Sequence, residues 1–251
     1  MGLFEAKIRT MKRNDNEPSR MVLSPSMKLA DLIELNYSLL IVLSRLGISL
    51  GFGENTVAEV CRSHGIDVSS FLLICGVYTY DDYIAPNELL KAGNPADIVK
   101  YLHSSHSFYL DDELPKLEQT IEELVRPCAV SQQKVIYRFF SEYKKEVENH
   151  FAYEENTVFP YVSALLARNE HDGYSMEQFE ENHSNIDEKL NDLKNIVMKY
   201  LPPICDTVLR NSVLYHIFFL EDDLDRHTMI ENNVLVPMVN RLEENEKREQ
   251  Q

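Results

Sequence analysis

Four long segments of the chain repeat apolar side chains every three to four residues, which is the period of an amphipathic α-helix. They run over residues 96–125, 132–168, 175–200 and 205–244. The sequences Arg126-Pro127, Asp172-Gly173 and Leu201-Pro202-Pro203 separate them. Because these connections are short, consecutive helices should run antiparallel, which predicts an up-down-up-down four-helix bundle over residues 96–244.

Shorter helical segments precede the bundle. We expect one helix from an N-cap at Ser26 to about Leu43, one from Asn55-Thr56 to Gly65, and one capped by Asp67 or Ser69 and ending near Gly76. Residues 25–86 are therefore predicted to form a small helical domain, after a polar N-terminal tail (residues 1–24) and before a linker (residues 78–95). Strand-like alternation is not found, so the predicted fold class is all-α.

Charge and composition narrow the class of protein. The 25 basic and 41 acidic residues give a net charge of −16, which argues against nucleic acid as a partner. The most apolar stretch, around Leu39–Leu43, is interrupted by Arg45 well short of the ~20 residues of a membrane span. Since the first 24 residues hold no apolar signal segment, we expect a cytoplasmic protein without membrane contact. A homodimer stays among the alternatives.

The four cysteines, Cys61, Cys75, Cys128 and Cys205, form no C-x-x-C pair. This spacing is typical of neither a disulfide framework nor a zinc finger. We interpret them as small buried apolar side chains.

Two segments share one pattern of polar residues. In each, a histidine (His150, His227) is followed four residues later by a glutamate (Glu154, Glu231), then by an asparagine two residues on, and by a proline ten residues after the histidine. Corresponding positions are 77 residues apart, and the same offset relates His106 to His183. The bundle therefore consists of two copies of a helical hairpin, each with one histidine on its first helix and H-x-x-x-E on its second.

This spacing predicts a metal site. Residues i and i+4 share a helix face, so an imidazole and a carboxylate from each H-x-x-x-E can reach one point. A single such motif is more often an exposed helix pair, but two copies at a matched offset favour a shared buried site. The predicted ligands are His106, His150, Glu154, His183, His227 and Glu231. One carboxylate can span two metals, and this nitrogen and oxygen set suits iron or manganese, with zinc as an alternative.

Other residues near the motifs have weaker support. His103 lies one turn before His106 and is either a seventh ligand or a supporting group. We favour the supporting role, because the position 77 residues later, 180, is a glutamate and not a histidine. His216 is about three turns from His227, too far for the same site. Pro160 and Pro237 cannot donate to the carbonyls four residues earlier, so each helix should bend or loosen just beyond its ligands.

The order H…H-x-x-x-E…H…H-x-x-x-E resembles that of hemerythrin-like cation-binding domains. The ending Glu231-Asn-Asn-Val-Leu-Val-Pro237 is similar to the ScdA-type family, named for repair of iron centres, and the segments His106–Pro115 and Thr56–Asp67 resemble its first-helix motif and its small N-terminal domain. The likeness covers about residues 25–243. Many members have a Cys pair where this chain reads Gly51-Phe52-Gly53-Glu54.

The resemblance implies a hemerythrin-like bundle with two non-haem iron ions, oxo- or hydroxo-bridged, on the six ligands above, with the glutamates as bridges. It further implies a role in nitrosative and oxidative stress: repairing damaged iron–sulfur clusters in client proteins, or handling nitric oxide. The alternatives are an oxygen, nitric oxide or redox sensor without catalytic turnover, and a protein that stores iron or oxygen.

Overall fold

The computed structural model describes residues 23–169, 174–182 and 187–249. These residues form helices with short connections, and within these ranges the only β-type pairing is an isolated bridge between Lys28 and Thr56. The predicted all-α fold class is therefore confirmed.

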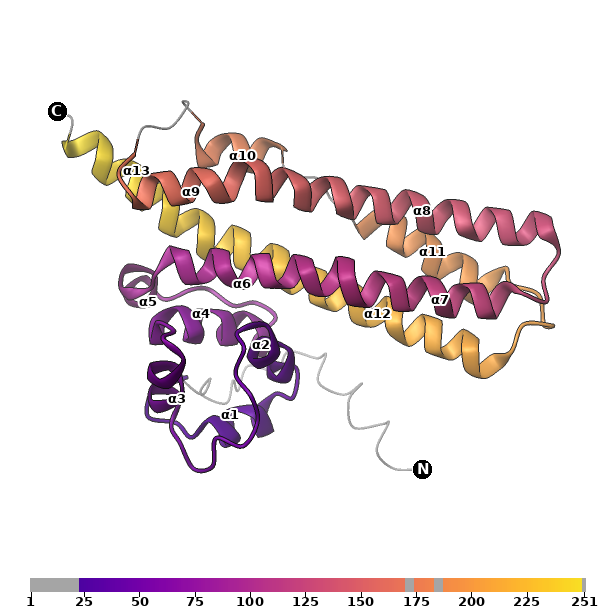
Figure 1. Cartoon of the computed structure of the whole chain (residues 1–251), viewed down its shortest axis with the longest axis horizontal. Coiled ribbons are helices and arrows are strands. Elements are labelled where there is room, and N and C mark those ends of the chain that lie inside the picture. Colours follow the sequence, from indigo (N-terminus) through magenta and orange to yellow (C-terminus); the bar gives the residue numbers. More distant parts are fainter. Residues whose placement is uncertain (1–22, 170–173, 183–186, 250–251) are drawn as a thin grey trace, which may run out of the picture.

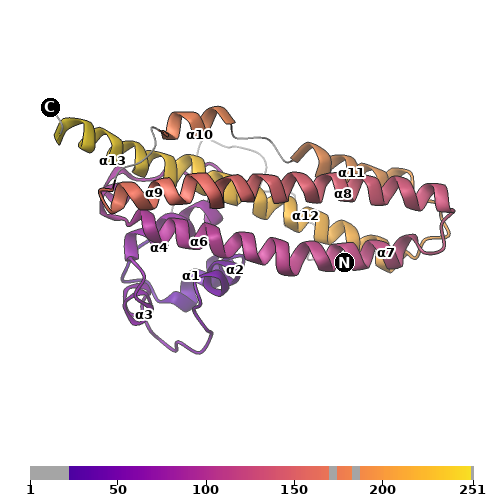
Figure 2. The ribbon, with the colours of Figure 1, turned by 45° about the horizontal axis from the view of Figure 1, so that its top comes forward.

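Three long helical rods and two shorter helices form the long body of the molecule (Figure 1). The rods are α6 (Pro95–Ser107), η2 (Phe108–Glu113) and α7 (Leu114–Val125); α8 (Val130–Tyr153), η3 (Glu154–Val158) and α9 (Phe159–Leu166); and α12 (Thr207–Ile230), η4 (Glu231–Leu235) and α13 (Val236–Glu249). The shorter helices are α10 (Met176–Asn182) and α11 (Asp187–Lys199). The α7–α8 and α11–α12 connections lie together at one end of the body, so the rods alternate in direction. Figure 2 shows α11 beside α8, and α11 also contacts α12.

The N-terminal helices are α1 (Leu29–Leu35), α2 (Leu39–Arg45), α3 (Val57–His64), α4 (Val68–Thr79) and α5 (Asn87–Ala92). They lie beneath the half of the body that holds α6, α9 and α13 (Figure 1). The last of them, α5, falls within the stretch that we expected to be a linker.

The single helix expected from Ser26 to Leu43 is wrong: the chain breaks between α1 and α2. Asn36 explains the break, because its side-chain amide donates to the Tyr78 carbonyl (2.6 Å) and its Oδ1 accepts from the Ser38 backbone N–H (2.9 Å). A side chain that bonds the backbone in this way competes with helical hydrogen bonds.

The next two helices begin at the expected caps, and the first of them also ends as expected. Thr56 caps α3 in a reciprocal box with Glu59, and Gly65 follows its end in the left-handed conformation (φ 66°). Asp67, the first of the two proposed caps, accepts from the Ser70 backbone N–H at the start of α4. The end of α4 lies at Thr79, three residues beyond the expected Gly76.

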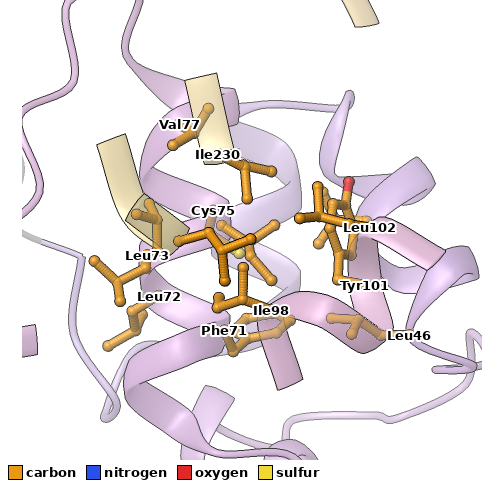
Figure 3. Packing of buried hydrophobic residues seen from close by; sticks show 14 of the residues in the cluster. Leu46, Phe71, Leu72, Leu73, Cys75, Val77, Ile98, Tyr101, Leu102 and Ile230 are labelled. Carbon is orange, nitrogen blue, oxygen red and sulfur yellow. The ribbon is translucent and has the colours of Figure 1, made fainter. Parts of the chain in front are cut away.

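Helix α4 is buried on every side from Ser70 to Tyr78. Figure 3 shows Phe71 and Cys75 facing Ile98 and Leu102 of α6 and Ile230 of α12. In the described part of the chain, no single helix is long and apolar enough to cross a membrane, although α3 and α4 pass that test jointly as a sharply bent pair.

Two apolar clusters divide the interior. One joins the N-terminal helices to α6, α9 and α13, and the other fills the space among α7, α8, α11 and α12. Polar side chains interrupt the apolar core where the two clusters meet. Five of the six predicted metal ligands are among these side chains.

Candidate metal centre

The structure brings five of the six predicted ligands together inside the bundle. His106 lies in the last turn of α6, His150 in the last turn of α8 and His227 in the last turn of α12. Glu154 and Glu231 are the first residues of η3 and η4. All five are buried, with the two glutamates at 0% exposure. The sixth, His183, lies outside the described residues.

Glu154 is at the centre of this group. Its Oε1 is 2.7 Å from His150 Nε2, and its Oε2 is 2.9 Å from His106 Nε2 and 3.7 Å from His227 Nε2. Glu231 Oε1 approaches His227 Nε2 at 3.1 Å. The two oxygens of one carboxylate therefore face imidazoles from different helices.

Two trios of these residues could each hold a cation. One is His106, Glu154 and His227, and the other is His150, Glu154 and Glu231; within each trio the ligand atoms lie within 4.8 Å of one another. Because Glu154 belongs to both, the two cation positions would share its carboxylate. The residues equivalent to the first trio, 77 positions away in the repeat, are His183, Glu231 and His150. The repeat therefore predicts that His183 would be a further ligand of the cation held by the second trio.

The ligand atoms fit a cation better than they fit one another. Both oxygens of Glu154, Nε2 of His106 and Nε2 of His227 are buried and make no hydrogen bond of acceptable geometry, despite their closeness. Leaving such groups unsatisfied costs about 1–3 kcal/mol each, and more when they are charged. Imidazole nitrogens and carboxylate oxygens aimed at a common space are the donor set of iron, manganese or zinc.

Burial and mutual charge set the electrostatics of the metal-free site. Burial raises the pKa of the Glu154 carboxyl, but the imidazoles of His106, His150 and His227 more than offset this and hold that pKa well below its usual range. Burial lowers the pKa of His227, and the Glu231 and Glu154 carboxylates reverse the effect and raise it to about 10. The site therefore stabilises positive charge at its centre.

Wider π-helical turns follow the ligands on three rods. The N–H of Leu114 donates to the carbonyl of Tyr109, and the equivalent bonds from Phe159 to Glu154 and from Val236 to Glu231 also span five residues. The next residue is a proline in every case (Pro115, Pro160, Pro237). The loosening expected beyond both H-x-x-x-E motifs is thus confirmed, in the form of π turns, which are frequent at functional sites.

Glu155 is the site residue that the sequence patterns missed. Its Oε1 accepts a hydrogen bond from His106 Nδ1 (2.6 Å), which leaves Nε2 of His106 on the side of Glu154. His103 Nδ1 donates to the same carboxylate at 2.8 Å, and its side chain is 62% exposed. His103 therefore supports Glu155 from the surface, and its role as a seventh ligand is not favoured. The repeat offered no signal for Glu155, since position 232 is an asparagine.

Aromatic rings enclose the ligands. The Phe151 ring stacks on His106 with centroids 4.1 Å apart and also contacts His227 at 5.5 Å. The Phe159 ring also stacks on His106, with centroids 5.4 Å apart, and the Tyr109 ring meets His227 edge-on, with centroids 6.2 Å apart. These contacts cover the imidazole rings and restrict the orientation of their planes.

A buried polar cluster lies one helical turn from His227. Asp223 forms an ion pair with Arg45 of α2 and accepts hydrogen bonds from Tyr78 of α4 and Tyr109 of η2. Tyr101 of α6 completes the cluster by donating to Tyr78 (2.9 Å). Burial, followed by the Asp223 charge, raises the pKa of Tyr109 well above its ordinary value, so this phenol stays protonated and donates. The cluster joins the N-terminal helices to the helix that carries His227.

The remaining described histidines lie elsewhere. His216 bonds to Glu113 (2.8 Å), and His64 ends α3 with its ring on the Val60 carbonyl (2.9 Å). His171 lies outside the described residues.

Comparison with known proteins agrees with this geometry. Residues 97–239 match the hemerythrin HHE cation-binding domain family, which covers more than half of the chain. The chain therefore belongs to this family of cation-binding helical proteins. No curated protein matches the chain in a sequence search.

Proposed function

We propose that this chain is a non-haem di-iron protein of the nitrosative and oxidative stress response. Its ligands would be His106, His150, His183 and His227 with Glu154 and Glu231, and both glutamates would bridge the two ions. The observation that carries the proposal is the pair of buried trios sharing Glu154.

Iron is favoured over manganese by the ligand types, and over zinc by the resemblance to the ScdA-type family. Imidazole-rich sites with two carboxylates suit redox-active iron, whereas manganese is held mainly by oxygen ligands. A bound pair of iron ions would supply positions for nitric oxide or oxygen. The protein's own residues would surround those positions with aromatic rings, and the Glu155 contact would keep Nε2 of His106 directed toward the ions.

The biological role that we propose is handling of nitric oxide or oxygen by a cytoplasmic protein, with repair of iron–sulfur clusters in client proteins as its outcome. The Cys pair of the ScdA-type family is replaced by residues 51–54, where Gly51 and Gly53 have positive φ angles. This exposed turn carries no thiol, so we propose that the chemistry takes place in the bundle.

A redox or gas sensor without turnover is the second candidate, and one contact favours it. The Arg45–Asp223 ion pair connects α2 to α12 one turn from His227, so a change at the ligands could reach the N-terminal helices. Hydrogen exchange of α2, compared between protein with and without nitric oxide, separates this function from turnover of nitric oxide.

Metal analysis with Mössbauer spectroscopy, on protein purified without added metal, tests the proposal. We expect about two iron ions per chain and a quadrupole doublet typical of coupled high-spin iron. Glu154→Ala and Glu231→Ala should each lower iron content and thermal stability together, because ligation and folding are linked. Glu122→Gln, on the exposed face of α7, is the matched control and should keep both. Full iron occupancy in both alanine variants would contradict the assignment of bridges.

A further inference from the structure

Cys128 and Cys205 meet at the end of the bundle opposite the N-terminal helices. Cys128 lies in the α7–α8 connection and Cys205 in the α11–α12 connection, and their sulfur atoms are 2.8 Å apart. Both are free thiols, 7% and 3% exposed. They are 77 residues apart, so they occupy equivalent places in the two hairpins.

The two connections hold these thiols in matching ways. The Cys128 N–H donates to the Val125 carbonyl (2.9 Å), and the Cys205 N–H donates to the Pro202 carbonyl (3.1 Å), so each cysteine closes a four-residue turn of the same kind. Side chains from the following helices fix both turns.

Those two side chains are also equivalent in the repeat. Gln133 of α8 donates to the Cys128 carbonyl (2.9 Å), and Arg210 of α12 donates to the Pro202 carbonyl (2.7 Å). The sulfur positions are thus set by backbone and side-chain bonds in both connections before any covalent link forms.

We propose that Cys128 and Cys205 are a reversible dithiol–disulfide site that locks this end of the bundle under oxidising conditions. A disulfide bond is about 2.05 Å long, so the sulfurs need to approach by only about 0.8 Å. The link would join the two hairpins and close a loop that contains α8, η3, α9, α10 and α11.

The oxidant class is a hydroperoxide, and the reductant class is a dithiol. One thiolate attacks a peroxide oxygen, the O–O bond breaks, a sulfenic acid forms, and the other oxygen leaves as hydroxide, which takes up the proton that the thiol released and becomes water. The second sulfur then attacks the first, the S–O bond breaks and water leaves, so two thiols and one hydrogen peroxide give one disulfide and two waters. A dithiol reverses the reaction by two exchange steps and becomes a disulfide itself.

The protonation of the thiols sets the rate of this reaction. Burial and the neighbouring Cys205 thiol raise the pKa of Cys128 to about 11, so little thiolate exists at neutral pH, and oxidation by the hydroperoxide should be slow there and faster as the pH rises. Thiol pairs of this kind in reducing compartments oxidise transiently, as redox-responsive sites.

This site is separate from the metal centre. His150 and His227 each lie 20 residues along their helix from its first residue, which is about 30 Å. Oxidation of the cysteines should therefore leave iron content unchanged, and this proposal does not depend on the proposed function.

The test uses the full chain, reduced with dithiothreitol, desalted and treated with hydrogen peroxide. Denatured protein should lose two of its four thiols, and peptide mapping after alkylation should find Cys128 linked to Cys205 within one chain. Cys61 and Cys75, which are fully buried, should stay reduced. The midpoint of thermal unfolding should rise by roughly 10 °C, and dithiothreitol should reverse every change.

Two variants sharpen the result. Cys205→Ala should abolish the linked peptide and the rise in midpoint, whereas Cys75→Ala should keep both. Retention of four thiols, oxidation of Cys128 to sulfinic acid without a linked peptide, or links between chains would overturn the proposal. If Cys205→Ala fails to fold, the peptide map of the unaltered chain still decides between these outcomes.

Discussion

Glu155 holds His106 through the ring nitrogen that faces away from the other ligands. A carboxylate in this position fixes the tautomer and orientation of the imidazole and makes its other nitrogen more basic. His103 adds a second, solvent-exposed contact to the same carboxylate. The two residues should therefore differ in their effect on metal binding.

We expect Glu155→Ala to weaken metal binding by roughly 10- to 100-fold, with little change in helix content, because it removes the hydrogen bond that orients His106. His103→Ala should have a much smaller effect, since its side chain is mostly exposed. Competition with a chromophoric chelator measures both affinities. Equal losses in the two variants would show that the surface contact matters as much as the buried one.

For individual residues, the sequence predicted side chains that the structure brings together where the 77-residue repeat applied. The constant offset selected His106 over His103, and the structure brings His106 beside Glu154. Glu155 could not be found in this way, because its equivalent is Asn232. The same offset also relates Cys128 to Cys205, so the sequence contained a signal for that contact, although spacing alone cannot show that two connections meet.

The π turns are the feature that matters most at the scale of helices. A proline inside a helix lacks an N–H and its ring clashes with the carbonyl four residues earlier. One extra residue in the turn relieves that clash. Near Glu154, the side-chain amide of Asn156 also donates to the Ala152 carbonyl at 2.6 Å, which satisfies a backbone group within the irregular region.

Pro160→Ala should allow the rod to return to regular α-helix beyond Glu154. We expect the metal-free protein to gain about 1 kcal/mol or more in unfolding free energy, because the substitution removes a helix-breaking residue. Metal affinity should fall several-fold, since the turn that places Glu154 would change. Urea unfolding and chelator competition measure the two effects. A stability gain at unchanged affinity would show that packing, not proline, maintains the π turn.

The sequence predicted these irregular turns only in outline. Pro160 and Pro237 indicated loosening, but a proline is also compatible with a kink or a helix end. The break at Asn36 was missed for another reason. It depends on a hydrogen bond to the Tyr78 carbonyl, a partner 42 residues away that no local pattern reveals.

For the whole molecule, the cluster around Asp223 joins the N-terminal helices to the bundle. Arg45 looked in the sequence like an interruption of an apolar stretch, and the structure gives the reason for its presence. It is 8% exposed, and it pairs with an aspartate 178 residues later in the chain. Such a long-range partner could not be identified from one sequence.

Arg45→Met should lower the unfolding free energy by about 3–5 kcal/mol, because it leaves the Asp223 carboxylate buried without its cation. Denaturant unfolding measures the loss. The double variant Arg45→Met/Asp223→Leu should recover much of it, since no isolated charge remains. Lys28→Met breaks the exposed pair with Glu54 and should change nothing measurable. Failure of the double variant to recover any stability would show that packing of Arg45, rather than its charge, is what matters.

The contact between Glu155 and His106 also makes the two halves of the bundle chemically unequal. The first hairpin places a carboxylate directly after its ligand glutamate, and the second places the neutral Asn232 there. Two ions bound by otherwise matched ligands would then have different affinities. Titration with iron should show two unequal steps, and a half-filled species should accumulate at one equivalent of metal.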